Sequence, residues 1–192
     1  PVETLAMLRA LPNFRVFRPC DAVETAECWA LAIKNTAGPS GIVLTRQGVP
    51  LQRLEHTDEN LCGRGAYVLV EGENSERQVT LLATGSEVQI AMAAREKLQK
   101  KGVSTAVVSM PCWELFNDQD NTYRENVLGP NTFRVAIEAG VRMGWDRYIG
   151  EQGEFIGMTS FGASAPGGKL FEHFGITADI VAATVLNRLK NY

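Results

Sequence analysis

The sequence is poor in the residues that build metal centres and disulfide frameworks. It has only two histidines, His56 and His173, and four widely spaced cysteines with no CxxC pair among them: Cys20, Cys28, Cys62 and Cys112. Cysteines in this arrangement are typical of buried free thiols in a reducing compartment, rather than of disulfides or zinc ligands. We therefore expect a cytoplasmic protein with no metal ligands in this chain.

Long apolar runs, a strong excess of one charge, internal repeats and low-complexity segments are also missing. No stretch approaches the roughly 18 apolar residues of a membrane-spanning helix, so no membrane partner is expected. The net charge is −3, and the densest basic group (Lys97, Lys100 and Lys101) is typical of a solvated helix end. This balance argues against nucleic acid as a partner.

The length of 192 residues suits one large domain, or one domain and part of another. The chain begins at Pro1 rather than at a methionine and enters directly into a helical pattern, which suggests a fragment of a longer protein. Residues 48–63 have no clear period and contain glycine, proline and several charges, as linkers do. We expect a first unit over residues 1–55, a linker over 56–63 and a second unit over 64–192.

The first unit is predicted to be the remnant of an α/β domain. A helix over 2–10 and a strand over 14–17 precede a helix with Asp21 as its N-cap, where Glu24 completes a capping box. One face of this helix is expected to be buried: Val23, Ala26, Ala30 and Ile33. An apolar run over 42–44 then predicts a strand buried on both faces. The order strand, helix, strand fits a parallel crossover but is too small to form a core alone.

The second unit alternates strands with helices. Its first two strands, 66–70 and 79–83, are expected to pair antiparallel. The following helix begins at a predicted capping box, ends at Gly102, and buries one face: Val88, Ala91, Ala94 and Leu98. The unit is therefore predicted to be α/β, with a mixed, mostly parallel sheet, one antiparallel strand and helices on both faces.

Arg46 is the candidate binding residue of the first unit. It follows the apolar run 42–44, at the edge where α/β proteins hold their ligands. A guanidinium is always charged and forks well onto phosphate. On position alone, however, a surface arginine at the end of a strand is the preferred interpretation.

Other candidates in the sequence have plainer structural explanations. The turn from Thr84 to Glu87 opens a helix after a strand and could hold an anion, but Glu87 places a negative charge there, so capping is preferred. Ser164 could be a nucleophile, yet His173 lies nine residues further along the following helix, so Ser164 is predicted to be an N-cap. Glu138 ends a strand as a carboxylate without a visible partner, which is weak evidence for acid–base chemistry.

His56 and the tryptophans are given no chemical role. A lone histidine in a linker is more often exposed to solvent than catalytic. The three tryptophans show no stacking arrangement with basic residues and are expected in the core: Trp29, Trp113 and Trp145.

Several short motifs, taken in order, resemble the transketolase family. They cover nearly the whole chain: RPCD at 18–21, LTRQ at 44–47, ATGSEV at 83–88, VSMP at 108–111, EAG at 138–140 and GMTSFGASAP at 157–166. The resemblance implies a thiamin-diphosphate enzyme with three domains. Residues 1–55 would be the end of its pyrimidine-binding domain, and residues 64–192 its C-terminal domain. The cofactor and its divalent ion, Mg²⁺ or Ca²⁺, would be held by residues upstream of Pro1.

The resemblance also implies a reaction and a role for Arg46. The family transfers a two-carbon ketol unit from a ketose phosphate, such as xylulose 5-phosphate, to an aldose phosphate, such as ribose 5-phosphate. Such enzymes are homodimers that serve the pentose phosphate pathway and the Calvin cycle. Arg46 matches the arginine that binds the phosphate of the substrate, while no catalytic, cofactor or metal residue falls within this chain. The fragment alone is therefore expected to be inactive.

Two alternatives remain at the level of sequence. The chain could belong to a related ketol-transferring enzyme, a deoxyxylulose-phosphate or dihydroxyacetone synthase. It could instead be a free-standing ligand-binding or regulatory α/β module that uses the helix start at Ser86, although the glycine-poor turn argues against this.

Overall fold

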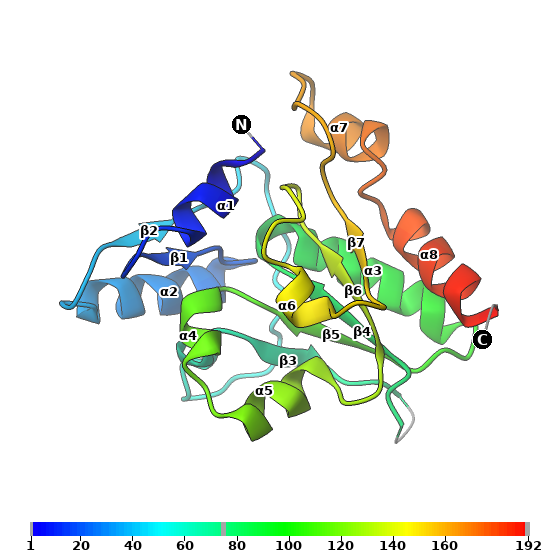
Figure 1. Ribbon diagram of the computed structural model, residues 1–192, viewed down its shortest axis with the longest axis horizontal. Helices are drawn as coiled ribbons and strands as arrows, with labels where there is room; N and C mark the ends of the chain where they lie inside the picture. The colour runs from blue at the N-terminus through cyan, green and yellow to red at the C-terminus, as the bar shows by residue number, and fades with distance from the viewer. Residues whose placement is uncertain (1, 74–75, 191–192) are drawn as a thin grey trace.

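The computed structural model describes residues 2–73 and 76–190, and its first elements form a small two-stranded unit (Figure 1). Its strands run parallel, with Arg15 opposite Ser40 and Phe17 opposite Ile42. The elements in chain order are α1 (Thr4–Arg9), β1 (Arg15–Phe17), α2 (Ala22–Lys34) and β2 (Ser40–Ile42). The parallel crossover predicted for this unit is confirmed.

The prediction for the buried face of α2 is wrong. None of the four predicted residues is buried, and Ile33 is 73% exposed. The buried residues of α2 are Glu24 and Cys28, because the helix packs against the short 3-10 helix η1 (Leu61–Arg64) and against a sheet of only two strands. The opposite side of the helix faces solvent, and Trp29, which was expected in the core, is 51% exposed there.

A five-stranded sheet forms the second unit, in the order β3-β5-β4-β6-β7. β4 is parallel to both β5 and β6, β7 is parallel to β6, and β3 is antiparallel to β5. The strands are β3 (Tyr67–Val70), β4 (Val79–Ala83), β5 (Thr105–Ser109), β6 (Phe133–Ile137) and β7 (Glu154–Ile156). The predicted mixed, mostly parallel sheet with one antiparallel strand is confirmed.

The partner of the antiparallel strand differs from the prediction. β3 does not pair with β4, because β5 lies between them. All five residues of β4 are buried, as is typical of a central parallel strand. The crossover through α3 (Val88–Gln99) places β5 beside β4, and β3 then pairs with the outer edge of β5.

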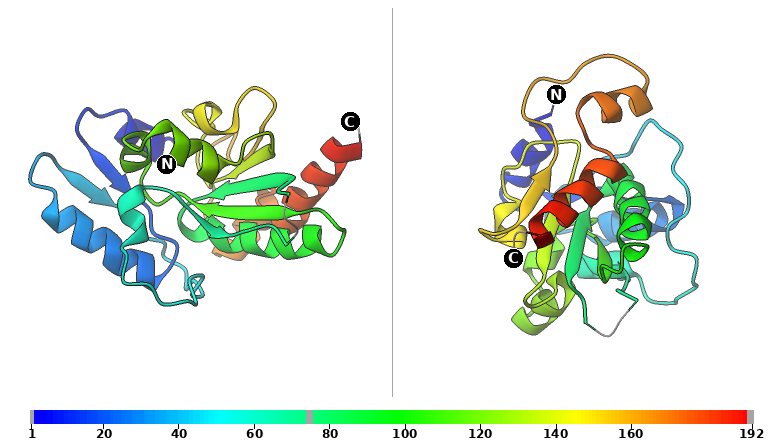
Figure 2. Two further views of the ribbon diagram at one scale, coloured as in Figure 1. Left: turned by 90° about the horizontal axis from the view of Figure 1, so that it is seen from below. Right: turned by 90° about the vertical axis from the view of Figure 1, so that its right-hand side faces the viewer.

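Helices cover both faces of this sheet (Figures 1 and 2). On one face α3 packs with α8 (Ala178–Lys190), and the predicted buried face of α3 is confirmed at all four positions. The opposite face is covered by three helices: α4 (Trp113–Asn117), α5 (Asn121–Leu128) and α6 (Asp146–Ile149). Gly102, at φ 76°, ends the turn after α3 in a conformation that favours glycine.

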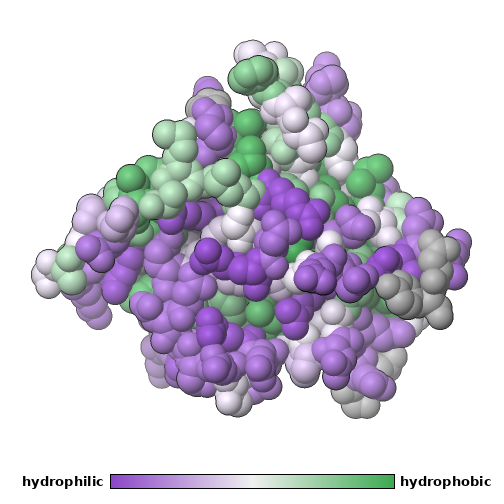
Figure 3. Space-filling model, in the orientation of Figure 1, coloured by the Kyte–Doolittle hydropathy of each residue, from purple (hydrophilic) through white to green (hydrophobic). Residues whose placement is uncertain are grey.

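The first unit lies beside the five-stranded sheet rather than over one of its faces (Figure 2). Apolar side chains reach the surface around α1 (Figure 3). Met7 of α1 is 63% exposed, and Leu11, which follows the helix, is 50% exposed. Within the described ranges, no helix has both the length and the apolar character needed to cross a membrane.

Candidate functional site

Arg46 lies on an exposed segment that follows β2. The strand ends at Ile42, and Leu44 is 54% exposed, so the prediction of a strand buried on both faces through residue 44 is wrong. The cause is the size of the sheet, since two strands leave one face of β2 without cover. Arg46 itself is exposed and, among the described residues, has no hydrogen bond or ion pair. Its guanidinium is therefore free to bind an anion.

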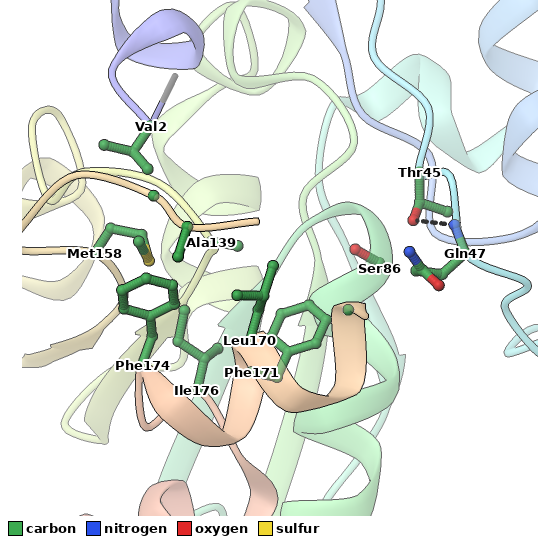
Figure 4. A pocket seen from close by; sticks show the side chains of 13 residues that line it. Val2, Thr45, Gln47, Ser86, Ala139, Met158, Leu170, Phe171, Phe174 and Ile176 are labelled. Atoms are coloured by element: carbon green, nitrogen blue, oxygen red, sulfur yellow. Dashed lines mark hydrogen bonds between the residues drawn. The ribbon is translucent and has the colours of Figure 1, made fainter. Parts of the chain in front are cut away.

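A cavity of about 250 Å³ lies next to this segment, at the junction of the two units. Thr45 and Gln47, which flank Arg46, lie on one side of it near Ser86 (Figure 4). Apolar side chains from the second unit form the other side: Met158, Leu170, Phe171, Phe174 and Ile176. The Thr45 hydroxyl accepts a hydrogen bond from the Gln47 amide at 3.1 Å, which turns the chain at Arg46.

Gln47 also contacts the start of α7 (Gly167–His173). A Cβ atom at Gly167 would lie 3.0 Å from the Gln47 side-chain carbonyl carbon, so this glycine allows the close approach. The segment that carries Arg46 thus contacts the second unit through Gln47, and Thr45 lines the cavity between them.

Glu138 is buried at the carboxyl end of β6 and pairs with Arg9 of α1. The Arg9 guanidinium forks onto its carboxylate at 2.8 and 2.9 Å, and the Trp145 indole donates to the same carboxylate at 2.8 Å. Burial by itself raises the pKa of Glu138, but Arg9, Arg18 and Trp145 outweigh burial and hold the pKa below its usual value. The expectation of a lone carboxylate is therefore wrong: Glu138 is held by three donors, and its lowered pKa disfavours the protonated form that a general acid needs.

Arg9 also corrects the expectation for the tryptophans. Its guanidinium carbon lies 3.6 Å from the centre of the Trp113 ring, so a cation does stack on a tryptophan. Trp113 and Trp145 are buried as expected and meet edge to face, with ring centres 4.7 Å apart.

Arg18 crosses from the end of β1 into the second unit. Its guanidinium lies 2.5 Å from a Glu87 oxygen and 3.4 Å from a Glu138 oxygen, and donates to the Thr84 carbonyl at 3.0 Å. Burial lowers the pKa of Arg18, but the two carboxylates outweigh this effect and raise it. Two arginines of the first unit thus neutralise two buried carboxylates of the second.

The turn after β4 does not form the predicted capping box. Glu87 is the N-cap position of α3 without a side-chain capping bond, because its carboxylate is directed to other partners. It accepts from the Ser86 hydroxyl at 2.6 Å and from the Ala139 amide at 3.0 Å, besides the ion pair with Arg18. Thr84 donates to the Arg18 carbonyl at 3.2 Å. The charge of Glu87 at this helix start is therefore balanced by Arg18 of the first unit.

Glu24 joins the two units at a second buried point. The Asp21 side chain caps α2 as predicted, accepting from the Glu24 amide at 2.9 Å. The Glu24 carboxylate, however, accepts from the Cys20 amide at 2.7 Å rather than from the Asp21 amide, so the box is shifted by one residue. It also accepts from the hydroxyls of Tyr67 and Ser109, at 2.7 and 2.5 Å. Burial raises the pKa of Glu24, and these donors only partly oppose it.

The raised pKa predicts a pH dependence of stability. A carboxyl that holds its proton more tightly when folded contributes stability below its unfolded pKa of 4.5, and this contribution is lost as the pH rises through the raised value. Glu24→Gln cannot titrate, and Tyr67 and Ser109 hydroxyls can turn to accept from its amide. The free energy of unfolding in urea should therefore increase for the variant relative to the wild type as the pH rises above 4.5. Glu125→Gln, on the exposed side of α5, is the control; an equal gain there would contradict the prediction.

The positions of Ser164, His56 and the cysteines give none of them a catalytic or metal-binding role. Ser164 is exposed in the loop before α7, and the N-cap position is Pro166, so the predicted capping role of Ser164 is wrong. His56 is exposed as expected, with Asp58 at 3.1 Å as its neighbour. All four cysteines are free and buried. No group of three or more acidic, histidine or cysteine side chains in the described ranges is placed to hold a metal ion.

The charged network was missed from the sequence although a signal existed. Arg18, Glu87 and Glu138 each follow an apolar strand within four residues, as Arg46 does, and they carry opposite charges. The rule that directed attention to Arg46 therefore applied to them as well.

Two family models match the chain. The model for the transketolase-like TK C-terminal domain matches residues 65–177, and the model for the transketolase pyrimidine-binding domain matches residues 1–52. Among curated relatives, the transketolase of Sinorhizobium medicae is 56% identical over 99% of this chain, and that of Cereibacter sphaeroides is 52% identical over 98%. The chain spans 27% and 28% of the length of these two relatives.

Solved structures agree with these matches. A transketolase from Leishmania mexicana has a TM-score of 0.89 and 39% identity, and the alignment covers 100% of this chain and 28% of that one. A second structure is described as an inactive β4 tetramer of a split-gene transketolase. It has a TM-score of 0.81 and 26% identity, and the alignment covers 98% of this chain and 62% of that one.

Proposed function

The chain belongs to the transketolase family, and on that basis we propose that it is part of a longer thiamin-diphosphate-dependent ketol transferase. Residues 1–55 form the end of the pyrimidine-binding domain, residues 56–63 a linker, and residues 64–192 the C-terminal domain. The whole enzyme moves a two-carbon ketol unit from a ketose phosphate, xylulose 5-phosphate, to an aldose phosphate, ribose 5-phosphate. The matches of both family models, in the order expected, support this assignment.

Within that enzyme, Arg46 binds the phosphate group of the sugar substrate. The observation that carries this role is the exposed guanidinium without a partner among the described residues, on a segment packed against the second unit. Charge-assisted, forked hydrogen bonds from an arginine both attract and orient a phosphate. Orientation of the sugar is what the reaction needs from a residue remote from the reacting carbons.

Thiamin diphosphate supplies the stabilised carbanion that ketol transfer requires. The described residues do not fit the diphosphate end of this cofactor, because they contain no cluster of acidic or histidine side chains for its divalent ion. We assign the cofactor and the ion, Mg²⁺ or Ca²⁺, to parts of the longer protein outside this chain. The intact enzyme is a homodimer, and its buried free thiols suit the reducing cytoplasm.

An assay of ketol transfer tests the function. The full-length protein, with thiamin diphosphate and Mg²⁺, should convert xylulose 5-phosphate and ribose 5-phosphate, whereas the purified 192-residue chain should show no turnover under the same conditions. Turnover by the isolated chain would contradict the assignment of the cofactor site. Failure of the full-length protein to transfer the ketol unit would contradict the function itself.

A further inference from the structure

The five-stranded sheet has one point at which its topology predicts a ligand site. β5, which follows β4 in the chain, lies on one side of β4, and β6 lies on its other side. The order in which strands are placed in the sheet therefore changes direction between β4 and β6. In open α/β sheets, ligands bind in the crevice outside the carboxyl ends of the two strands that flank such a point. Here these ends are Ala83 and Ile137, which are register partners.

That crevice is filled by Arg18 of the first unit. Glu87 follows β4, Glu138 follows β6, and the Arg18 guanidinium lies against both carboxylates. The Arg18 backbone is held as well: its amide donates to the Pro111 carbonyl at 2.8 Å, and its carbonyl accepts from the Gly85 amide at 3.0 Å. The second unit thus binds one arginine through groups that follow three neighbouring strands.

Gly85 shows that this approach is built into the backbone. It has φ 57°, a conformation that favours glycine. A Cβ atom there would lie 2.9 Å from the Arg18 Cγ and 3.0 Å from its guanidinium carbon. A side chain at this position would therefore displace the arginine.

The held arginine is connected to the segment that carries Arg46. The Val43 amide, the first after β2, donates at 2.8 Å to the carbonyl of Phe17, the residue before Arg18. From Val43 the chain continues to Thr45 and Gln47, which line the cavity with Ser86 (Figure 4). Ser86 donates to Glu87 at 2.6 Å, so the residue that pairs with Arg18 also orients a side chain that lines this cavity.

We propose that Glu87 is a positioning residue that, by holding Arg18 in the ligand crevice of the C-terminal domain, sets the place of the Thr45–Gln47 segment and hence of Arg46. The crevice thus serves to hold an arginine of the same chain. The effect on catalysis rests on the proposed phosphate role of Arg46, whereas the effect on the segment does not.

Two measurements on the full-length enzyme test the proposal with Glu87→Gln, which keeps the size of the side chain and removes its charge. Amide hydrogen exchange at Val43, whose amide donates to the Phe17 carbonyl, should become at least about 10-fold faster, since the segment opens more often. The KM for ribose 5-phosphate should rise about 10-fold to 100-fold, as expected when a binding group is misplaced by about 1 Å. The kcat/KM for an unphosphorylated acceptor such as glycolaldehyde should be unchanged.

Glu96→Gln, the same change on the exposed side of α3, should alter neither measurement. Arg18→Lys keeps the positive charge but loses the guanidinium nitrogen that reaches Thr84, Glu87 and Glu138 together, and should act in the same direction as Glu87→Gln. Unchanged exchange at Val43 overturns the proposal whatever Arg46 binds. Faster exchange without a higher KM, in an enzyme whose Arg46→Ala variant is selectively impaired, overturns the link to catalysis. If exchange is faster but Arg46→Ala impairs phosphorylated and unphosphorylated acceptors equally, the result supports Glu87 as the positioning residue and refutes the phosphate role of Arg46.

Discussion

Replacement of Glu138 with alanine is expected to lower the free energy of unfolding by about 3–5 kcal/mol, the range for breaking one partner out of a buried ion pair. Glu138 is almost fully buried, and its carboxylate accepts both nitrogens of the Arg9 fork and the Trp145 indole. Without it, Arg9 keeps its position over Trp113 but loses its counter-charge. Arg18 is affected less, because Glu87 remains as its partner.

Urea unfolding of the full-length protein at neutral pH measures this loss. Glu151→Ala, in an exposed turn of the same unit, is the control and should change stability by less than about 0.5 kcal/mol.

The lowered pKa of Glu138 predicts a pH dependence as well. The stability that Glu138 contributes is present above pH 4.5, its ordinary pKa, and is lost as the pH falls through the lowered value. The difference between variant and wild type should therefore shrink in acid. A loss below about 1 kcal/mol, as for a surface pair, would show that the network is not a stabilising contact.

Replacement of Arg46 with alanine is expected to raise the KM for phosphorylated sugars and to leave the affinity for thiamin diphosphate unchanged. A hydrogen bond to a charged group contributes about 1.5–3 kcal/mol, which corresponds to a rise in KM of about 10-fold to 150-fold. Stability should hardly change, because Arg46 is exposed and has no partner among the described residues. Steady-state kinetics with ribose 5-phosphate measures the effect.

An unphosphorylated acceptor separates the phosphate role from a general loss of activity. The Arg46→Ala variant should use glycolaldehyde as well as the wild type does. Lys100→Ala removes one positive charge from the exposed end of α3 and should change neither substrate, which controls for long-range electrostatic attraction. Equal damage with phosphorylated and unphosphorylated acceptors would contradict the proposed role.

The sequence predicted correctly those features that depend on residues close together in the chain. The buried face of α3 followed from residues spaced by one helical turn, and the N-cap at Asp21 from its side chain and the three residues after it. The same method was wrong for α2, where Ile33 is exposed because the two-stranded sheet covers only one side of the helix. Helical periodicity shows that a face is apolar, but not whether another element covers it.

The candidate site shows the same division. Arg46 is a candidate from the sequence because it follows an apolar strand, and the structure adds only that its side chain is exposed; its binding role stays a prediction. The capping assigned to Glu87 was wrong, since the partners of that carboxylate come from residues 18 and 139 rather than from the helix itself. A capping box can be recognised within four residues, whereas an ion pair between segments cannot.

The sequence by itself determined the class of fold, the positions of most strands and helices, and one anion-binding candidate, because these depend on periodicity, turn residues and the charge that follows a strand. Only the tertiary structure decided that β5 separates β3 from β4, and that Arg9 meets Glu138 across 129 residues of chain. Charges so far apart in sequence are brought together by the way the two units pack, and burial then makes each of them depend on its partner.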